Sequence, residues 1–114
     1  MEHILKLQPE FYDYILHGTK RIENRLYDEK RQQIRLGDTI KFLREPELTQ
    51  SFTARVVGLL LYPDFASLFA DFDIAVLADK SYTKQQLLDK MQQFYPLAEQ
   101  RQYGAVGLRI EPIA

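Results

Sequence analysis

Six basic residues stand within sixteen positions of this chain, and one carboxylate lies among them. The basic residues are Lys20, Arg21, Arg25, Lys30, Arg31 and Arg35. Glu23 precedes the third of them by two positions, and Tyr27 follows it by two. Guanidinium and ammonium groups bind phosphates or base edges, a carboxylate accepts from an amine or orients a lysine, and a tyrosine ring stacks on a base. This spacing predicts that a binding or catalytic site lies in the segment.

The run from residue 21 to residue 27 reads as an extended strand. Successive side chains of a strand point to opposite faces. One face is expected to carry Arg21, Glu23, Arg25 and Tyr27. The other, largely apolar face is expected to carry Ile22, Asn24 and Leu26. If the apolar face packs on the core, the strand fixes the direction in which Glu23 points.

The element before this strand is predicted to position Lys20. An apolar stripe over residues 10–17 indicates an amphipathic helix, and Pro9 suits its first turn. Gly18 is placed to end the helix as a C-cap glycine. Lys20 then lies in a fixed loop just where the next strand begins.

The remaining pattern predicts further strands and helices. Strands are expected at residues 3–7, 39–42, 52–62 and 103–110, with the second and third of these paired antiparallel. Helices are expected at residues 64–72, with Asp64 as N-cap, and from a capping box at Thr83–Gln86 to about Phe94. Residues 28–33 are expected to form an exposed loop. Two glycines in the last strand, Gly104 and Gly107, indicate a bulge or a close backbone approach.

Composition narrows the functional classes. The length of 114 residues predicts one domain over residues 1–114. A formal net charge of −1 argues against a protein that coats nucleic acid indiscriminately, because such binding needs excess cations. The chain has no cysteine, and its two histidines lie far apart in sequence, so neither a metal site nor a cofactor is expected. No apolar run reaches the ~20 residues that span a bilayer and no signal peptide is recognised, so the default expectation is a cytoplasmic protein with no membrane partner.

The order of predicted elements gives a fold class. Strands at both ends, a meander in the middle and helices between them predict an α+β protein with a small, mostly antiparallel β-barrel. Residues 18–25 also contain Gly18, Lys20, Glu23 and Arg25 at the spacing Gly-x-Lys-x-x-Glu-x-Arg. This pattern resembles the signature of the ASCH domain, a branch of the PUA-like superfamily of RNA-associated barrels.

The resemblance extends over nearly the whole chain, including an Arg-x-Tyr-Gly segment that ends at Gly104, and it is closest to the short single-domain bacterial and archaeal members. It implies a PUA-like β-barrel of five or six strands flanked by helices, with a cleft at one mouth lined by the signature residues.

The first functional hypothesis is a module that binds single-stranded RNA, a nucleotide or a nucleoside through a local basic cleft. The residues expected to bind the ligand are Lys20, Arg21, Glu23, Arg25, Tyr27, Lys30, Arg31 and Tyr103. A structural or protein-interaction domain is a further, non-catalytic hypothesis. The residue pattern predicts no particular oligomeric state.

The second hypothesis is a small hydrolase with Lys20 and Glu23 as its catalytic pair. Some small ASCH proteins resemble amidohydrolases that remove an acyl group from N4-acetylcytidine with a lysine, a threonine and a glutamate. Lys20 matches the lysine, but Glu23 stands at the threonine position, and no glutamate stands near Asp79, where the family's glutamate would fall. The resemblance also leaves ribonuclease activity open. A lysine whose pKa is lowered by burial, with Glu23 as proton acceptor, is a possible pair for a different hydrolysis.

Overall fold

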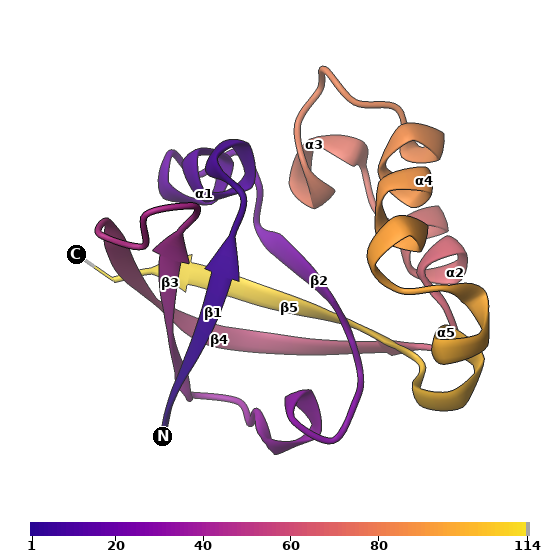
Figure 1. Ribbon diagram of the computed structural model, residues 1–114, viewed down its shortest axis with the longest axis horizontal. Coiled ribbons are helices and arrows are strands. Elements are labelled where there is room, and N and C mark those ends of the chain that lie inside the picture. The colour runs from indigo at the N-terminus through magenta and orange to yellow at the C-terminus, as the bar shows by residue number, and fades with distance from the viewer. Residues whose placement is uncertain (114) are drawn as a thin grey trace.

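A computed structural model describes residues 1–113, and it confirms the predicted α+β class. Within this range one curled, mixed sheet forms a half-barrel, and helices α2 to α5 gather on one side of it (Figure 1). The strands are β1 (Glu2–Leu7), β2 (Ile22–Leu26), β3 (Thr39–Arg44), β4 (Ser51–Tyr62) and β5 (Ala105–Pro112). The helices are α1 (Pro9–Leu16), α2 (Phe65–Ala70), α3 (Ile74–Leu77), α4 (Lys84–Phe94) and α5 (Leu97–Tyr103), with a short 3-10 helix η1 (Arg31–Gln33).

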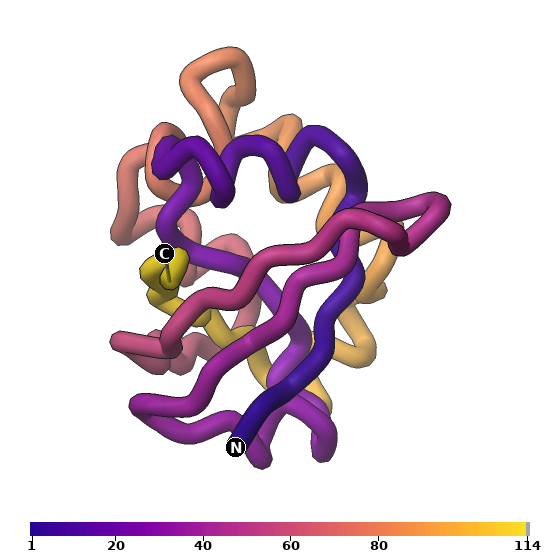
Figure 2. The backbone as a smooth tube through the Cα atoms, turned by 90° about the vertical axis from the view of Figure 1, so that its left-hand side faces the viewer, coloured from indigo at the N-terminus to yellow at the C-terminus, as the bar shows by residue number. Residues whose placement is uncertain are grey.

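The strands follow the order β1-β3-β4-β5-β2, so β1 and β2 are the two edges of the sheet. The predicted antiparallel pairing of β3 with β4 is confirmed, and β4–β5 and β5–β2 are also antiparallel. Only β1 and β3 pair in parallel within this sheet of the described chain, because α1 and β2 lie between them in sequence and provide the crossover. Figure 2 shows β1, β3 and β4 side by side, with α1 lying across one end of them.

The predicted helix boundaries are confirmed by their capping contacts. The backbone N–H of Gly18, at a φ of 83°, donates to the Ile15 carbonyl at 3.0 Å, as expected of a glycine just past a helix end. The Asp64 carboxylate accepts from the Ser67 N–H at 2.8 Å at the start of α2. The capping box at the start of α4 is complete, since the Thr83 hydroxyl and the Gln86 side chain each accept from the other's backbone N–H.

Three short helical segments were not expected from the sequence. The predicted loop at residues 28–33 contains η1, and α3 and α5 lie where no helix was predicted. α3 is only four residues long, and α5 carries no apolar stripe that periodicity could reveal. A buried glutamine holds α5 instead: Gln100 Oε1 accepts from the Phe65 N–H at 3.1 Å, and its Nε2 donates to the Tyr95 carbonyl at 2.8 Å.

Two hydrophobic clusters fill the interior, and β2 contributes Ile22 to one of them, while Tyr27, just after β2, packs against the other. One cluster packs α1 against the curled sheet, with Ile15, Ile40 and Phe42 fully buried. The other packs α2, α3 and α4 against the β2–β5 edge, with Ile22 and Phe65 fully buried. Both ends of β2 are anchored by buried apolar residues, Ile22 and Leu26, so the polar side chains between them are held in or near the interior.

The close backbone approach predicted for the last strand is confirmed. A Cβ at Gly107 would lie 2.9 Å from Cγ2 of Ile22, so only glycine lets β2 pack this closely on β5. Gly104 has a φ of 79°, in the left-handed region that glycine adopts readily. The bulge lies elsewhere, on β4 between Val56 and Gly58. Among residues 1–113, no helix is both long and apolar enough to cross a bilayer.

Candidate functional site

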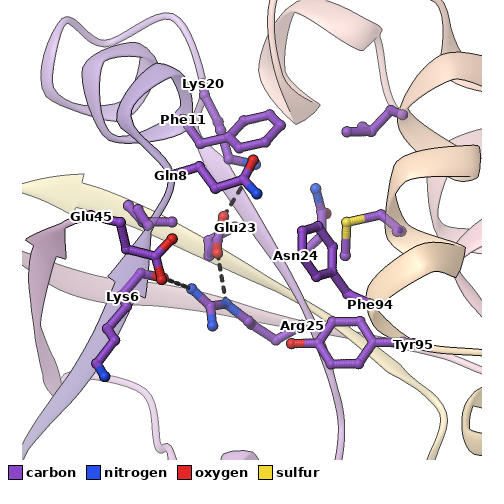
Figure 3. Close-up of a pocket in the computed structure, with 13 residues that line it drawn as sticks. Lys6, Gln8, Phe11, Lys20, Glu23, Asn24, Arg25, Glu45, Phe94 and Tyr95 are labelled. Carbon is purple, nitrogen blue, oxygen red and sulfur yellow. Dashed lines mark hydrogen bonds and ion pairs between the residues drawn. The ribbon is translucent and has the colours of Figure 1, made fainter.

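A pocket of about 210 Å³ opens where β2 faces the start of α1 and the end of α4. Its polar lining includes four residues from the segment 18–25 that carries the signature: Lys20, Glu23, Asn24 and Arg25. Its aromatic lining comes from Phe11, Phe94 and Tyr95. Figure 3 shows Glu23 between Lys20 and Arg25, with the ring of Tyr95 on the far side of the arginine.

Lys20 is held in the interior by the turn that ends α1. The N–H groups of Thr19 and Lys20 both donate to the Tyr14 carbonyl, so the backbone conformation at the lysine is fixed. The side chain is 3% exposed, and its Nζ donates to the carbonyls of Ile22 and Leu77, the latter at 2.6 Å. Burial lowers the pKa of the Lys20 amino group, although the Glu23 carboxylate opposes the shift.

Glu23 is the centre of the charge cluster. It is 6% exposed, its Oε2 accepts from Arg25 Nε at 2.7 Å, and its Oε1 lies 3.4 Å from Lys20 Nζ. Burial alone would raise the pKa of the Glu23 carboxyl, but the charges of Arg25 and Lys20 outweigh it and lower the pKa. Glu23 is therefore ionised and bridges two buried cations.

Arg25 joins the cluster to the end of β1. Its Nη2 donates to the Lys6 carbonyl at 2.7 Å, in addition to the Nε bond to Glu23. Burial alone would lower the pKa of Arg25, and the Glu23 carboxylate together with the Tyr95 side chain raises it instead. A guanidinium has five N–H donors, of which these two bonds use two. Arg25 thus has donors left to offer to a group in the pocket.

Asn24 lies on the opposite face of β2 from its two charged neighbours, as the alternation predicted. That face packs against α3, where Asn24 Nδ2 donates to the Leu77 carbonyl at 3.4 Å. The residue is 4% exposed and also lines the pocket. Both faces reach the same pocket because β2 is an edge strand with no neighbour on its outer side.

The structure brings Lys20, Glu23 and Arg25 into the pocket and places the other five predicted site residues outside its lining. Arg21 is exposed, and Lys30 is exposed beside η1. Tyr27 is half-buried against the cluster under α1. Arg31 donates to the Asp28 carboxylate at 2.7 Å, and Tyr103 is the partly buried last residue of α5.

Several pocket residues were not expected from the sequence. Phe94 and Tyr95 end the apolar pattern of α4 and were not among the predicted site residues, yet both line the pocket, and Phe94 is 51% exposed. Their position just before Pro96 was the available signal, because an apolar pair at a helix end projects beyond the buried stripe. The sequence pattern did not predict that Gln8 and Glu45 line the pocket. Each lies just after the end of a strand, and only the fold brings it to the pocket. In the described part of the chain, no three metal-ligating side chains cluster.

Comparisons with known proteins identify the family of the chain and solved structures with a similar fold. The ASCH domain family model matches residues 5–114. No curated protein matches the chain. Among solved structures, the hypothetical protein PH0355 is 33% identical with a TM-score of 0.87, covering 99% of this chain and 100% of that one. The protein PF0455 from Pyrococcus furiosus is 32% identical with a TM-score of 0.79, covering 99% and 98%.

A ZmASCH mutant protein from Zymomonas mobilis is 18% identical, with a TM-score of 0.65 over 98% of this chain and 72% of its own, which is a likeness of fold. The ASCH family is associated with RNA binding. The family model covers the half-barrel, the helices beside it and the Gly18–Arg25 signature alike. The chain belongs to the ASCH domain family.

Proposed function

We propose that this protein binds single-stranded RNA by holding one nucleotide in the pocket beside β2. The observation that carries the proposal is the Lys20–Glu23–Arg25 cluster, two cations around one carboxylate, buried at a pocket that also has aromatic walls. Structural ion pairs are usually placed on the surface, because burying charges costs free energy unless they are paired and hydrogen-bonded. A buried cluster beside a cavity is typical of a functional site.

The charge of the cluster suits a phosphate or a base edge. Glu23 balances one of its two cations, so the cluster carries one net positive charge when Lys20 is protonated. The Lys20 ammonium has acceptors for its donors in the carbonyls of Ile22 and Leu77 and in Glu23, which favours the charged form against the effect of burial. Arg25 supplies the planar donors that bind phosphate and carbonyl oxygens at two points.

The size and walls of the pocket suit a single base or nucleoside. Its volume of about 210 Å³ is below the ~300–1,000 Å³ of pockets that enclose drug-sized ligands. The half-exposed ring of Phe94 offers a face on which a base can stack, the usual means by which proteins hold unpaired RNA bases.

Titration of fluorescent single-stranded RNA and of mononucleotides tests the proposal. Wild type is expected to bind, with an affinity that falls as salt rises. The double variant Lys20→Ala/Arg25→Ala should lose binding, with thermal melts recorded to show that it is folded. Lys41→Ala/Arg55→Ala, which removes two cations from the far side of the sheet on β3 and β4, is the matched control. Equal losses in both double variants, or no binding by wild type, would contradict the proposal.

One observation favours the hydrolase alternative. Burial lowers the pKa of Lys20 while its Nζ lies 3.4 Å from Glu23 Oε1, the arrangement expected of an amine and a proton acceptor. The surroundings of Lys20 oppose it, because two carbonyls and the Glu23 carboxylate together offer three acceptors, which favour the ammonium, and an ammonium has no lone pair for attack. Incubation with N4-acetylcytidine and with single-stranded RNA, followed by chromatography, separates the alternatives: product that Lys20→Met fails to form would favour the enzyme.

A further inference from the structure

The pocket contains a buried acceptor that the protein itself does not use. Among residues 1–113, Oδ1 of Asn24 has no hydrogen-bond partner, although the residue is only 4% exposed. Nearly all buried polar side-chain atoms in folded proteins are paired, so an unpaired one that lines a cavity points to a missing partner. Asn24 lines the pocket described above.

The orientation of the Asn24 amide follows from its other contact. Nδ2 lies 3.4 Å from the Leu77 carbonyl, which can only accept. Rotating the amide by half a turn would place two acceptors, Oδ1 and the Leu77 oxygen, against each other. The Leu77 carbonyl already accepts from Lys20, so this part of α3 is fixed by two donors from the β2 segment. Oδ1 is therefore the free end of the amide.

The other acceptors of the pocket are either occupied or wet. The Glu23 carboxylate faces Arg25 with one oxygen and Lys20 with the other. Gln8 and Glu45 are partly exposed, so their side-chain oxygens are accessible to water. Asn24 Oδ1 is therefore a buried acceptor that a ligand can use. The N–H groups of Arg25 that bond neither to Glu23 nor to Lys6 are donors that the same ligand can use. A ligand that fills the pocket must then donate one N–H and can accept a bond from the guanidinium.

We propose that Asn24 determines the specificity of the pocket by accepting an N–H from the hydrogen-bonding edge of a nucleobase. This inference rests on the proposed function and adds the group that reads the base. A base that lacks the donor leaves Oδ1 unpaired in the complex as well, and a site built to hydrogen-bond a ligand group rejects the analogue without it. Stacking and charge alone would accept either base.

Nucleoside pairs that differ by methylation of the donor nitrogen test the role of Asn24. The pairs are uridine with N3-methyluridine, inosine with 1-methylinosine, and cytidine with N4,N4-dimethylcytidine, each titrated by calorimetry. In the pair that contains the preferred base, wild type is expected to bind the methylated nucleoside at least about tenfold more weakly. Asn24→Leu, which keeps the bulk and removes the acceptor, should bind both members of that pair within about twofold of each other.

Two controls make the outcome decisive. A methyl group also adds bulk, so discrimination that persists in Asn24→Leu would show steric exclusion and overturn the inference. Gln93→Leu makes the same chemical change at an exposed site on α4 and should discriminate as wild type does. Asn24→Ala serves the same purpose if the leucine variant does not fold. Nucleoside binding without discrimination refutes only the role of Asn24, whereas no binding of any nucleoside or RNA refutes the proposed function beneath it.

Discussion

Residues 20–25 and residues 30–35 each contain three basic side chains, and the fold treats the two groups in opposite ways. In the first, Lys20 and Arg25 are drawn inward around Glu23 and line a pocket. In the second, Lys30 and Arg35 are exposed, and Arg31 pairs with its near neighbour Asp28. We call these the inner and the outer basic groups.

The difference arises from the apolar residues between the charges. Ile22 and Leu26 are buried and tie the inner group to the interior, so the side chains between them follow the backbone inward. The outer group lies around η1, where Ile34 is buried but Leu36 is exposed, so a single buried apolar residue anchors this group. A high local density of charged residues therefore indicates where a site can be sought. The positions of the buried apolar residues between them decide which charged side chains line the pocket.

Removing the carboxylate of the inner group should have the largest effect. Glu23→Gln leaves Lys20 and Arg25 buried with their neutralising charge gone, and breaking a buried ion pair from one side costs about 3 kcal/mol of unfolding free energy. Glu29→Gln, next to the outer group, is the matched control, because its side chain is exposed and the change should stay within about 0.5 kcal/mol. Urea unfolding of both variants measures the contrast, and similar midpoints would refute the buried cluster.

The second prediction compares two lysines. Lys20→Met removes the buried ammonium that donates to the carbonyls of Ile22 and Leu77, which should cost about 2 kcal/mol. Lys30→Met, at an exposed position, should change stability by less than about 0.5 kcal/mol. Thermal and chemical denaturation at neutral pH give both values. If Lys20→Met were as stable as Lys30→Met, the ammonium would not be held by these carbonyls.

The third prediction concerns geometry at constant charge. Arg25→Lys keeps the positive charge but loses the planar fork that bonds to Glu23 and Lys6 while donating into the pocket. RNA binding should weaken by about tenfold, or about 1.4 kcal/mol. Arg35→Lys makes the same exchange at an exposed residue of the outer group and should leave binding unchanged. Binding that tolerates both exchanges would mean that charge alone attracts the ligand.

The smallest effect is expected at Asp38, the carboxylate that accepts from the Arg35 N–H in the outer group. Hydrogen bonds from His3 and from that N–H lower the pKa of Asp38 to about 2, from a usual value of 3.8. A carboxyl group whose pKa is lower in the folded state than in the unfolded state stabilises the fold at pH values above its unfolded-state pKa. This stability is lost as the pH falls through the folded-state pKa. Asp38→Asn should therefore flatten the pH dependence of melting slightly between about pH 4 and pH 2. An unaltered acid profile would contradict the shift.

Much of the fold could be predicted because its signals are local. Gly18, Asp64 and the Thr83 capping box mark helix ends through contacts within a few residues, and each contact is present. The parallel pairing of β1 with β3 and the helix α5 had no local signal. They depend on a crossover and on Gln100, a polar residue buried by partners far away in sequence.

The candidate site was predictable in part for the same reason. Lys20, Glu23 and Arg25 belong to one short segment, so they lie near one another in sequence as well as in the fold. Asn24 was expected on an apolar face, because strand alternation assumes one buried side and one exposed side. In β2 the polar residues of both faces, Glu23 and Asn24, are buried, and both line the pocket at the free edge of the strand.

The strand order also sets when the site can exist during synthesis. β2 pairs only with β5 within this sheet, so the strand that carries Glu23 and Arg25 finds its partner some eighty residues later in the chain. Until residues 105–112 have left the ribosome, the signature segment has no strand to join, and α4 and Tyr95 have no fixed position beside it. Contacts of such long sequence separation form late in folding, because the closure of the loop must precede them. The candidate site is therefore assembled only after β5 has joined β2 in the sheet.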